Sequence, residues 1–262
     1  MRDVDRTDGA TSETNAACPR GRPINKTEIL HMRVQHKIPL MVCGMLAICG
    51  LAAVHAETLY RTGFEAANEP FGDFVAGTLS NQNDWNQKGK AEVSTQSTHA
   101  GAQSVTPGPG DGKYGAGIEK RFEFPKKPEL WVDCMVDCDG FGGFVWVTGT
   151  SAASGEKPFP AVYFFITSNG INVKSGQDAP SVVVPKVKMD GWHRLTLRLN
   201  FVDKTYDLYV DANLLKEGIP FYTAPDFGQA EAFAGVTLGG ASDPESRAYY
   251  DDFSIATTFP LP

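Results

Sequence analysis

The sequence predicts an all-β protein, a two-sheet antiparallel β-sandwich of the jelly-roll type. Three observations lead to this prediction. Apolar and polar residues alternate with a period of two in many short segments, no segment sustains a helical period, and clusters of Gly, Pro, Asn and Ser separate the segments. A period of two is typical of strands with one face in a core. Many short strands with turn residues between them are typical of β-sandwiches and jelly rolls.

The clearest strand pair lies in residues 191–211, GWHRLTLRLNFVDKTYDLYVD. Its first strand alternates two sets of side chains, the apolar Leu195, Leu197, Leu199 and Phe201 and the polar Arg194, Thr196, Arg198 and Asn200. After a polar turn, the second strand continues the alternation with Tyr206, Leu208 and Val210. We therefore expect Leu197 in the core between two sheets and Thr196 on the opposite, wetter face.

Further strands are predicted along the rest of the chain. They cover residues 58–65, 91–97, 101–106, 116–124, 129–138, 142–149, 159–168, 171–175, 181–184, 233–238 and 248–256. Asn169-Gly170 is a strong signal for a tight hairpin turn between two of them. Residues 66–90 are rich in Gly, Asn and Gln, and we expect them to form a long surface excursion.

The first 56 residues predict an export signal. Residues 1–31 are polar and without periodicity, so they form either a disordered leader or a mis-annotated start. Residues 32–56 combine a short basic segment, an apolar run and a small-residue Val-His-Ala site, which is the form of a secretory signal peptide. A membrane anchor is the alternative, although the apolar run is short for one. We therefore expect a secreted protein, extracellular or periplasmic, that begins at Glu57 and has no membrane span after cleavage.

The mature chain is acidic. Removing residues 1–56 takes away 7 of the 24 basic and 5 of the 31 acidic residues, which leaves 17 against 26 and a net charge near −9. Such a surface repels phosphate groups, so we expect no nucleic acid partner. The hydrophobic content of 42% is ordinary for a globular chain. We assign residues 57–256 to one sandwich and residues 257–262 to a tail.

Two cysteines of the mature chain, Cys134 and Cys138, fall in the predicted strand 129–138. Residues four apart in an extended strand are roughly 13 Å apart, which is beyond the reach of a disulfide. We expect two small buried side chains. A disulfide would require the strand to end or bulge between them.

Short motifs follow one another in a distinctive order along the mature chain. They are Phe64-Glu65 with the later Gly77, Leu79, Gln82 and Trp85, then Gly101–Val105, Gly191-Trp192-His193, Tyr206–Asp211 and Tyr250-Asp251-Asp252-Phe253. In this order the chain resembles the concanavalin A-like lectin/glucanase superfamily, in its laminin-G-like jelly-roll form. The resemblance implies a two-sheet sandwich that often binds sugars and often carries calcium. It does not imply an enzyme, because this fold hosts lectins, glycanases, lyases and structural modules.

The sequence does not match the catalytic patterns of enzymes on this fold. Laminarinase-like members carry alternate carboxylates on one strand, whereas Glu129, Asp133 and Asp137 are four residues apart. The Gln-x-His and Tyr-x-Lys patterns of jelly-roll alginate lyases are also missing. The two histidines of the mature chain, His99 and His193, are expected in a turn and in a packed position. We therefore expect no catalytic residues.

The expected function is that of a secreted, non-catalytic glycan-binding or cell-surface module. Two alternatives remain open at this point. The first is a polysaccharide-active enzyme on the same fold, either a polysaccharide lyase or a glycoside hydrolase. The second is a structural or adhesion protein without a small ligand. The expected partner is a polysaccharide or other glycan.

Strand parity proposes a ligand-binding surface. In residues 129–138 the apolar positions face the core, which turns Trp131, Asp133 and Asp137 to the other face. Trp146 holds the corresponding parity in the next strand. We therefore expect Trp131 and Trp146 to share an exposed sheet face, where rings stack on sugars and the two aspartates accept hydrogen bonds from hydroxyls. The alternative is that a loop covers one tryptophan and makes it part of the core.

Three carboxylates propose a structural calcium site. Glu65 follows the first predicted strand, and Asp251 and Asp252 lie in the last. The resemblance implies that these two strands are neighbours, which brings the carboxylates together. Like charges in a small space repel each other unless one is protonated or a cation lies between them. Calcium is the cation expected outside the cell, because it prefers hard oxygen ligands.

Overall fold

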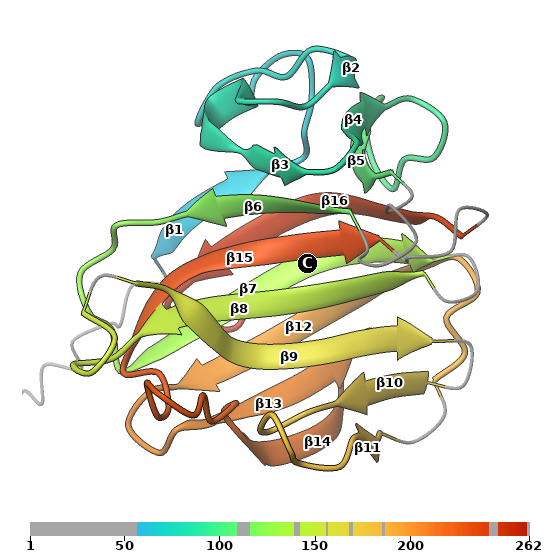
Figure 1. Ribbon diagram of the computed structural model, residues 1–262. Coiled ribbons are helices and arrows are strands. Elements are labelled where there is room, and N and C mark those ends of the chain that lie inside the picture. Colours follow the sequence, from blue (N-terminus) through green and yellow to red (C-terminus); the bar gives the residue numbers. More distant parts are fainter. Residues whose placement is uncertain are drawn as a thin grey trace, which may run out of the picture. The chain divides into compact units, whose positions relative to one another are not determined.

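The computed structural model describes residues 57–108, 116–138, 142–155, 157–167, 170–184, 187–240 and 246–260. The predicted leader and signal peptide lie outside these residues. The described chain forms two antiparallel sheets that pack into a β-sandwich, as the sequence predicted (Figure 1). No helix in the described ranges is long and apolar enough to cross a membrane.

The first sheet contains nine strands among the described residues. Their order is β14-β13-β12-β7-β16-β5-β4-β2, and β1 also pairs with β16. The strands are β1 (Thr58–Thr62), β2 (Gly77–Thr78), β4 (Ala91–Ser94), β5 (Ser104–Pro107), β7 (Glu129–Cys138), β12 (Trp192–Asn200), β13 (Thr205–Val210), β14 (Asn213–Pro220) and β16 (Ala248–Ala256). The first and last strands are therefore neighbours, as the resemblance implied.

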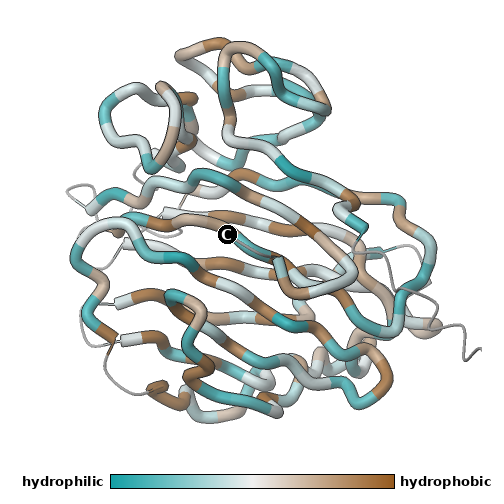
Figure 2. The backbone as a smooth tube through the Cα atoms, turned by 180° about the vertical axis from the view of Figure 1, so that it is seen from behind, coloured by the Kyte–Doolittle hydropathy of each residue, from teal (hydrophilic) through white to brown (hydrophobic). Residues whose placement is uncertain are grey.

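The second sheet contains seven strands in the described part of the chain. Their order is β11-β10-β9-β8-β15-β6-β3. The strands are β3 (Asn86–Lys88), β6 (Gly117–Arg121), β8 (Gly143–Thr150), β9 (Phe159–Thr167), β10 (Gly170–Val173), β11 (Val182–Val183) and β15 (Ala232–Gly240). Seen from behind, the strands of the sandwich show alternating hydrophilic and hydrophobic residues (Figure 2).

The core lies between the two sheets and confirms the predicted parity of the central hairpin. Leu197 is 1% exposed and lies directly opposite Leu208 of β13 and Val132 of β7. Its neighbours at the same parity, Leu195 and Leu199, are equally buried. Burying a leucine side chain contributes about 1.5–3 kcal/mol, so this hairpin anchors both its sheet and the interface between the sheets.

Residues 66–90 are not the simple surface excursion that the sequence predicted. Leu79 and Trp85 are fully buried, and the Trp85 indole N–H donates to the hydroxyl of Tyr60 in β1 at 3.1 Å. The amide of Gln82 donates to two backbone carbonyls at 2.8 and 2.9 Å and accepts from a backbone N–H. The polar segment therefore packs around a few buried side chains. Its polar composition gives no sign of this packing.

Cys134 and Cys138 are both buried in β7, and no disulfide joins them. The strand continues without interruption between them, which keeps their sulfur atoms too far apart to bond. The prediction of two small buried side chains is confirmed.

Candidate functional site

The face of the nine-stranded sheet that points away from the core carries the candidate site, and we call it the outer face. It contains the residues of β7 and β12 that alternate with those facing the core between the sheets. Trp131, Asp133, Met135 and Asp137 of β7 lie opposite Arg198, Thr196, Arg194 and Trp192 of β12. The central strands of the sandwich therefore present polar, charged and aromatic groups side by side.

Asp133 and Arg194 form a largely buried ion pair on this face. Arg194 Nε donates to the two carboxylate oxygens of Asp133 at 3.0 and 3.1 Å, and the Thr196 hydroxyl donates to Oδ1. Burial raises the pKa of the Asp133 carboxyl, whereas Arg194 and Thr196 lower it. Both oxygens of Asp133 are thus engaged by the protein, and its role is to hold the Arg194 guanidinium in place.

The ring of His99 is oriented by Asp252. His99 Nδ1 lies 2.7 Å from Asp252 Oδ2, and both side chains remain partly exposed. Asp252 has a φ of 45° at a bulge, where the register of β16 against β7 shifts between Asp251 and Ser254. A bulge re-aims side chains along a strand. Here it buries Asp251 completely while Asp252 stays exposed.

The buried Asp251 carboxylate holds the loop that carries His99. Its Oδ2 accepts from the backbone N–H groups of His99 and Ala100 at 3.0 and 3.2 Å, and its Oδ1 accepts from the N–H of Asp252 at 2.8 Å. Burial raises the pKa of Asp251 to about 6, although these hydrogen bonds lower it. One carboxylate therefore fixes the backbone, and its neighbour fixes the imidazole.

Two further carboxylates, those of Glu65 and Glu69, accept hydrogen bonds from loop backbone on the side away from the Asp133–Arg194 pair. Glu65 accepts from the backbone N–H groups of Ala102 and Gln103 at 3.0 and 3.2 Å. Glu69 Oε1 accepts from the N–H groups of Gly63 and Glu65 at 2.7 and 2.9 Å. Hydrogen bonds from backbone amides to carboxylates are strong, so these two groups fix the loops in place.

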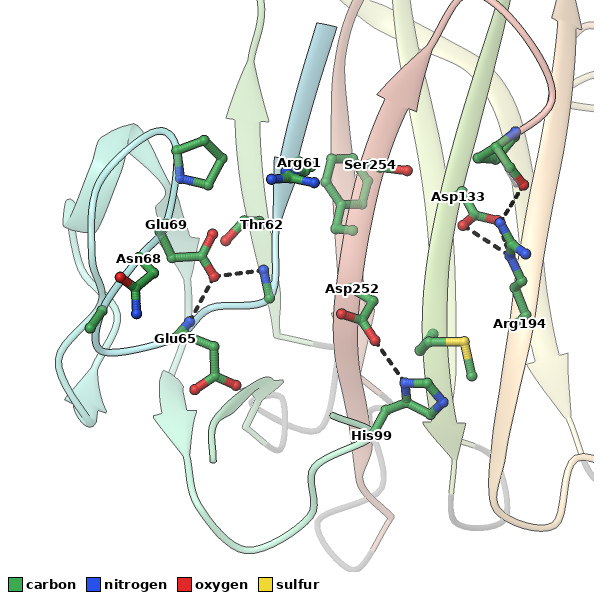
Figure 3. Close-up of a pocket in the computed structure, with 16 residues that line it drawn as sticks. Arg61, Thr62, Glu65, Asn68, Glu69, His99, Asp133, Arg194, Asp252 and Ser254 are labelled. Carbon is green, nitrogen blue, oxygen red and sulfur yellow. Dashed lines mark hydrogen bonds and ion pairs between the residues drawn. The ribbon is translucent and has the colours of Figure 1, made fainter. Parts of the chain in front are cut away.

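A pocket of about 800 Å³ opens between these groups. Its lining includes Arg61 of β1, Asp252 and Ser254 of β16, Met135 of β7, and the loop residues Asn68 and His99. Figure 3 shows Glu65, Asn68 and Glu69 on one side of the pocket, the Asp133–Arg194 pair on the other, and the His99–Asp252 pair between them. Arg61 is exposed and has no ion-pair partner among the described residues.

Trp192 adds an aromatic ring beside the pocket. Its ring centroid lies 5.8 Å from that of His99, and it shares the parity of Arg194 on β12. The sequence analysis assigned no binding role to Trp192 or His99. The bulge at Asp252, which aims a carboxylate at the imidazole, leaves no recognisable signal in the sequence. His193, by contrast, lies against Asp211 at 2.8 Å, away from the lining of the pocket.

No protein-family model matches the sequence, and no curated protein matches it. Solved structures do align with the fold. An endo-β-1,4-glucuronan lyase from the fungus Trichoderma reesei aligns with a TM-score of 0.50 and 12% identity, over 78% of this chain and 97% of the lyase. A carbohydrate esterase from the Shiga toxin-encoding bacteriophage phi24B aligns with a TM-score of 0.55 and 13% identity, over 78% of this chain and 99% of the esterase.

The chain has a concanavalin A-like jelly-roll fold. At such low identity the alignments show the fold alone, so the site has to be argued from its own residues. In this concanavalin A-like sandwich, the pocket brings together three sequence-predicted site residues, Glu65, Asp133 and Asp252, and the others lie outside its lining.

Trp131 and Trp146 do not share a sheet face, which corrects the sequence-based expectation. Trp131 is in β7 of the nine-stranded sheet and Trp146 is in β8 of the seven-stranded sheet. Trp146 packs against Phe144 and Tyr163 of its own sheet, with ring centroids 4.6 and 4.8 Å away. Consecutive strands of this concanavalin A-like fold can belong to different sheets, so parity within each strand does not place two strands together.

Asp137 lies further along β7 than Asp133, at the end of the outer face. Its Oδ2 accepts from the Ser97 hydroxyl at 3.1 Å. Of the predicted calcium ligands, Glu65 and Asp252 line the pocket, whereas Asp251 is fully buried and is not part of its lining. Among the described residues, no group of three or more His, Cys, Asp or Glu side chains is spaced to hold a metal ion.

Proposed function

We propose that this protein is a secreted glycan-binding β-sandwich module, and that it binds a saccharide in the pocket on the outer face of the nine-stranded sheet. The observation that carries this proposal is the pocket itself. It is about 800 Å³ in volume and places fixed polar groups next to apolar surface. Ligand pockets of roughly 300–1,000 Å³ with a few well-placed polar groups are typical of small-molecule sites.

The lining suits the chemistry of a sugar ring. Arg61 and Asn68 offer hydrogen-bond donors, and Ser254 offers both a donor and an acceptor. Met135 and the nearby Trp192 offer apolar surface for the C–H groups of the ring. The carboxylates around the pocket are held by backbone amides or by cationic partners, so the site is organised before a ligand arrives.

The two aligned structures are both described as carbohydrate-active proteins, a glucuronan lyase and a carbohydrate esterase. The likeness to them establishes the fold, and a carbohydrate ligand for this chain is our proposal. The proposal therefore depends on the pocket residues and not on the names of those proteins.

A glycan array followed by calorimetry with the glycans that bind tests the proposal. Arg61→Ala and His99→Ala should each weaken binding by roughly tenfold or more, which is the effect of losing one good polar contact. Arg121→Ala is the matched control, because Arg121 is an exposed arginine on β6 of the other sheet. An array on which no glycan binds, or equal affinities for all three variants and the parent, would contradict the proposal and favour a structural or adhesion role.

A polysaccharide-active enzyme is the second candidate, and one observation favours it. Asp252 orients the His99 imidazole at 2.7 Å in the pocket that the cationic Arg61 also lines. A histidine positioned by a carboxylate is a common general base. Incubation with polysaccharides, followed by measurement of new reducing ends and of unsaturated products, separates the two candidates. Product formation that is lost in His99→Ala would establish the enzyme, whereas binding without product would establish the module.

A further inference from the structure

Trp131, the tryptophan predicted to stack on sugars, is covered by the C-terminal segment, which we define as Thr257–Pro260. Trp131 is only 8% exposed although it lies on the outer face of the sheet. The Phe259 ring packs against it in a T-shaped arrangement, with centroids 5.1 Å apart and an interplanar angle of 81°. Phe259 also contacts Tyr209 at 5.9 Å. The segment thus occupies the place above the indole where a ligand ring would lie.

The indole of Trp131 is held in place by groups other than this segment. Its Nε1 donates to Glu129 Oε1 at 3.1 Å, and the Arg198 guanidinium lies 5.8 Å from the ring centroid. Arg198 in turn bonds Glu129 at 2.6 Å. Tyr209 packs beside the indole at 5.7 Å. These contacts come from β7, β12 and β13, so they would persist if the segment moved away.

The segment itself is held mainly by the packing of Phe259, which contacts Trp131, Tyr209 and, at 5.9 Å, the Arg194 guanidinium; its hydrogen bonds are few. Thr257 pairs with Glu57 through its backbone N–H at 3.0 Å. Beyond Thr257, one hydrogen bond to another described residue holds the segment, from Arg194 Nη2 to the carbonyl of Pro260 at 2.6 Å. All four residues of the segment keep part of their surface exposed. A stretch with few hydrogen bonds and partial exposure opens at low cost compared with the core.

The covered surface continues the proposed binding pocket. Pro260 lines that pocket together with Asp133 and Arg194. Trp131 lies two residues along β7 from Asp133 on the same face, which is a distance of roughly 7 Å. That distance is about the length of one sugar unit or slightly more, so a glycan chain that leaves the pocket in this direction meets the C-terminal segment first.

We propose that Trp131 and Tyr209 form a second saccharide subsite, which the C-terminal segment occupies until a longer glycan displaces it. The segment presents the same chemistry as such a ligand. The Phe259 ring packs against the indole in a T-shaped arrangement, and the Pro260 carbonyl accepts the hydrogen bond of Arg194. This inference rests on the proposed function, because the subsite extends the same pocket. The apparent affinity of a glycan for a covered subsite is reduced by the fraction of molecules in which the subsite is open.

The first part of the test needs no glycan. The full chain is labelled with 5-fluorotryptophan, and the Trp131 signal is assigned with Trp131→Phe. In Phe259→Ala, a soluble gadolinium chelate should broaden the Trp131 signal more strongly than in the parent, while the melting temperature changes by less than about 3 °C. Unchanged broadening, or a large fall in melting temperature, would show that the segment belongs to the core and would overturn the inference.

The second part measures binding of cello-oligosaccharides and β-1,4-glucuronan oligosaccharides of two and six units. Phe259→Ala should bind the six-unit chain roughly tenfold more tightly than the parent does, with no gain for the two-unit chain. The double variant Phe259→Ala with Trp131→Ala should lose this gain. Two-unit binding without any length-dependent gain would overturn the inference and leave the proposed function standing. Absence of binding to both lengths in all proteins would overturn the inference, while the glycan array decides separately on the proposed function.

Discussion

Arg194 donates through Nε to both carboxylate oxygens of Asp133, at 3.0 and 3.1 Å, with 16% and 9% of the two side chains exposed. This pair joins β12 to β7 beneath the pocket, and the same arginine reaches Pro260 of the C-terminal segment. Two charges withdrawn from water stabilise each other only while both are present, because each one would be costly to leave alone. The pair therefore links the stability of the sheet to the geometry of the site.

Asp133→Ala should lower the free energy of unfolding by about 3–5 kcal/mol, the cost of leaving one partner of a buried ion pair unpaired. Sequence parity alone placed Asp133 on an exposed sheet face and did not reveal its buried partner. Urea unfolding of Asp133→Ala, Arg194→Ala and the double variant measures the coupling between the two residues. A double variant that loses as much as the sum of the single variants would mean that the pair contributes no interaction energy.

Leu197→Ala should lower the free energy of unfolding by about 2–5 kcal/mol through lost burial and a residual cavity. The predicted contrast with Thr196 needs revision, because Thr196 is fully buried and its hydroxyl donates to Asp133. Thr196→Val keeps the shape but removes one of the two donors to Asp133 Oδ1, so we expect a loss of about 1.5–3 kcal/mol, as for a hydrogen bond to a charged group. Thermal and urea unfolding measure both values. A larger loss in Thr196→Val than in Leu197→Ala would reverse our assignment of the core face.

The strands that the sequence predicted best have one face in the core and the other face toward solvent or polar groups. Residues 129–138 and 248–256 were predicted with the bounds that β7 and β16 have in the structure. One face of each strand carries apolar side chains into the core, although the bulge at Asp252 interrupts the alternation of β16. The edge strand β14 (Asn213–Pro220) was missed. It is exposed along most of its length, so its side chains carry no periodic signal.

The candidate site could be predicted only in part. Parity turned Trp131 and Asp133 to the outer face, but it could not show that Arg194 and Phe259 engage them from other strands and from the segment after β16. The sheet to which a strand belongs depends on contacts far away in the sequence. For this reason the sequence analysis placed Trp146 on the wrong sheet. The positive φ of Asp252 is equally non-local, because the surrounding sheet and loop stabilise a conformation that the residue itself disfavours.

Export stays a prediction from the sequence of residues 32–56. If these residues form a signal peptide, cleavage after Ala56 removes the leader, and N-terminal sequencing of protein from the medium or periplasm should begin at or near Glu57. A chain in which the apolar run is interrupted by two lysines should remain in the cytosol, because the run would no longer be recognised. Recovery of the intact chain from the cytosol, with none exported, would remove the basis for a secreted module.

Calcium binding by Glu65, Asp251 and Asp252 also stays a prediction. The structure shows the first two carboxylates accepting hydrogen bonds from backbone amides, which already stabilise their charges. The raised pKa of Asp251, about 6, nevertheless shows that burial still opposes ionisation of this group. A cation beside Asp251 would offset the cost of ionising this buried carboxylate. The site therefore has a physical reason to bind a cation.

Calcium at millimolar concentration should therefore raise the melting temperature. For an extracellular site with a dissociation constant of about 0.1–1 mM, 10 mM calcium adds about 1–3 kcal/mol of stability, or roughly 3–8 °C for a domain of this size. Asp251→Asn should abolish the shift, and magnesium at the same concentration should reproduce little of it, because its smaller ion demands a stricter geometry. An unchanged melting temperature in 10 mM calcium would contradict the prediction. The carboxylates would then act only by fixing the loops around the pocket.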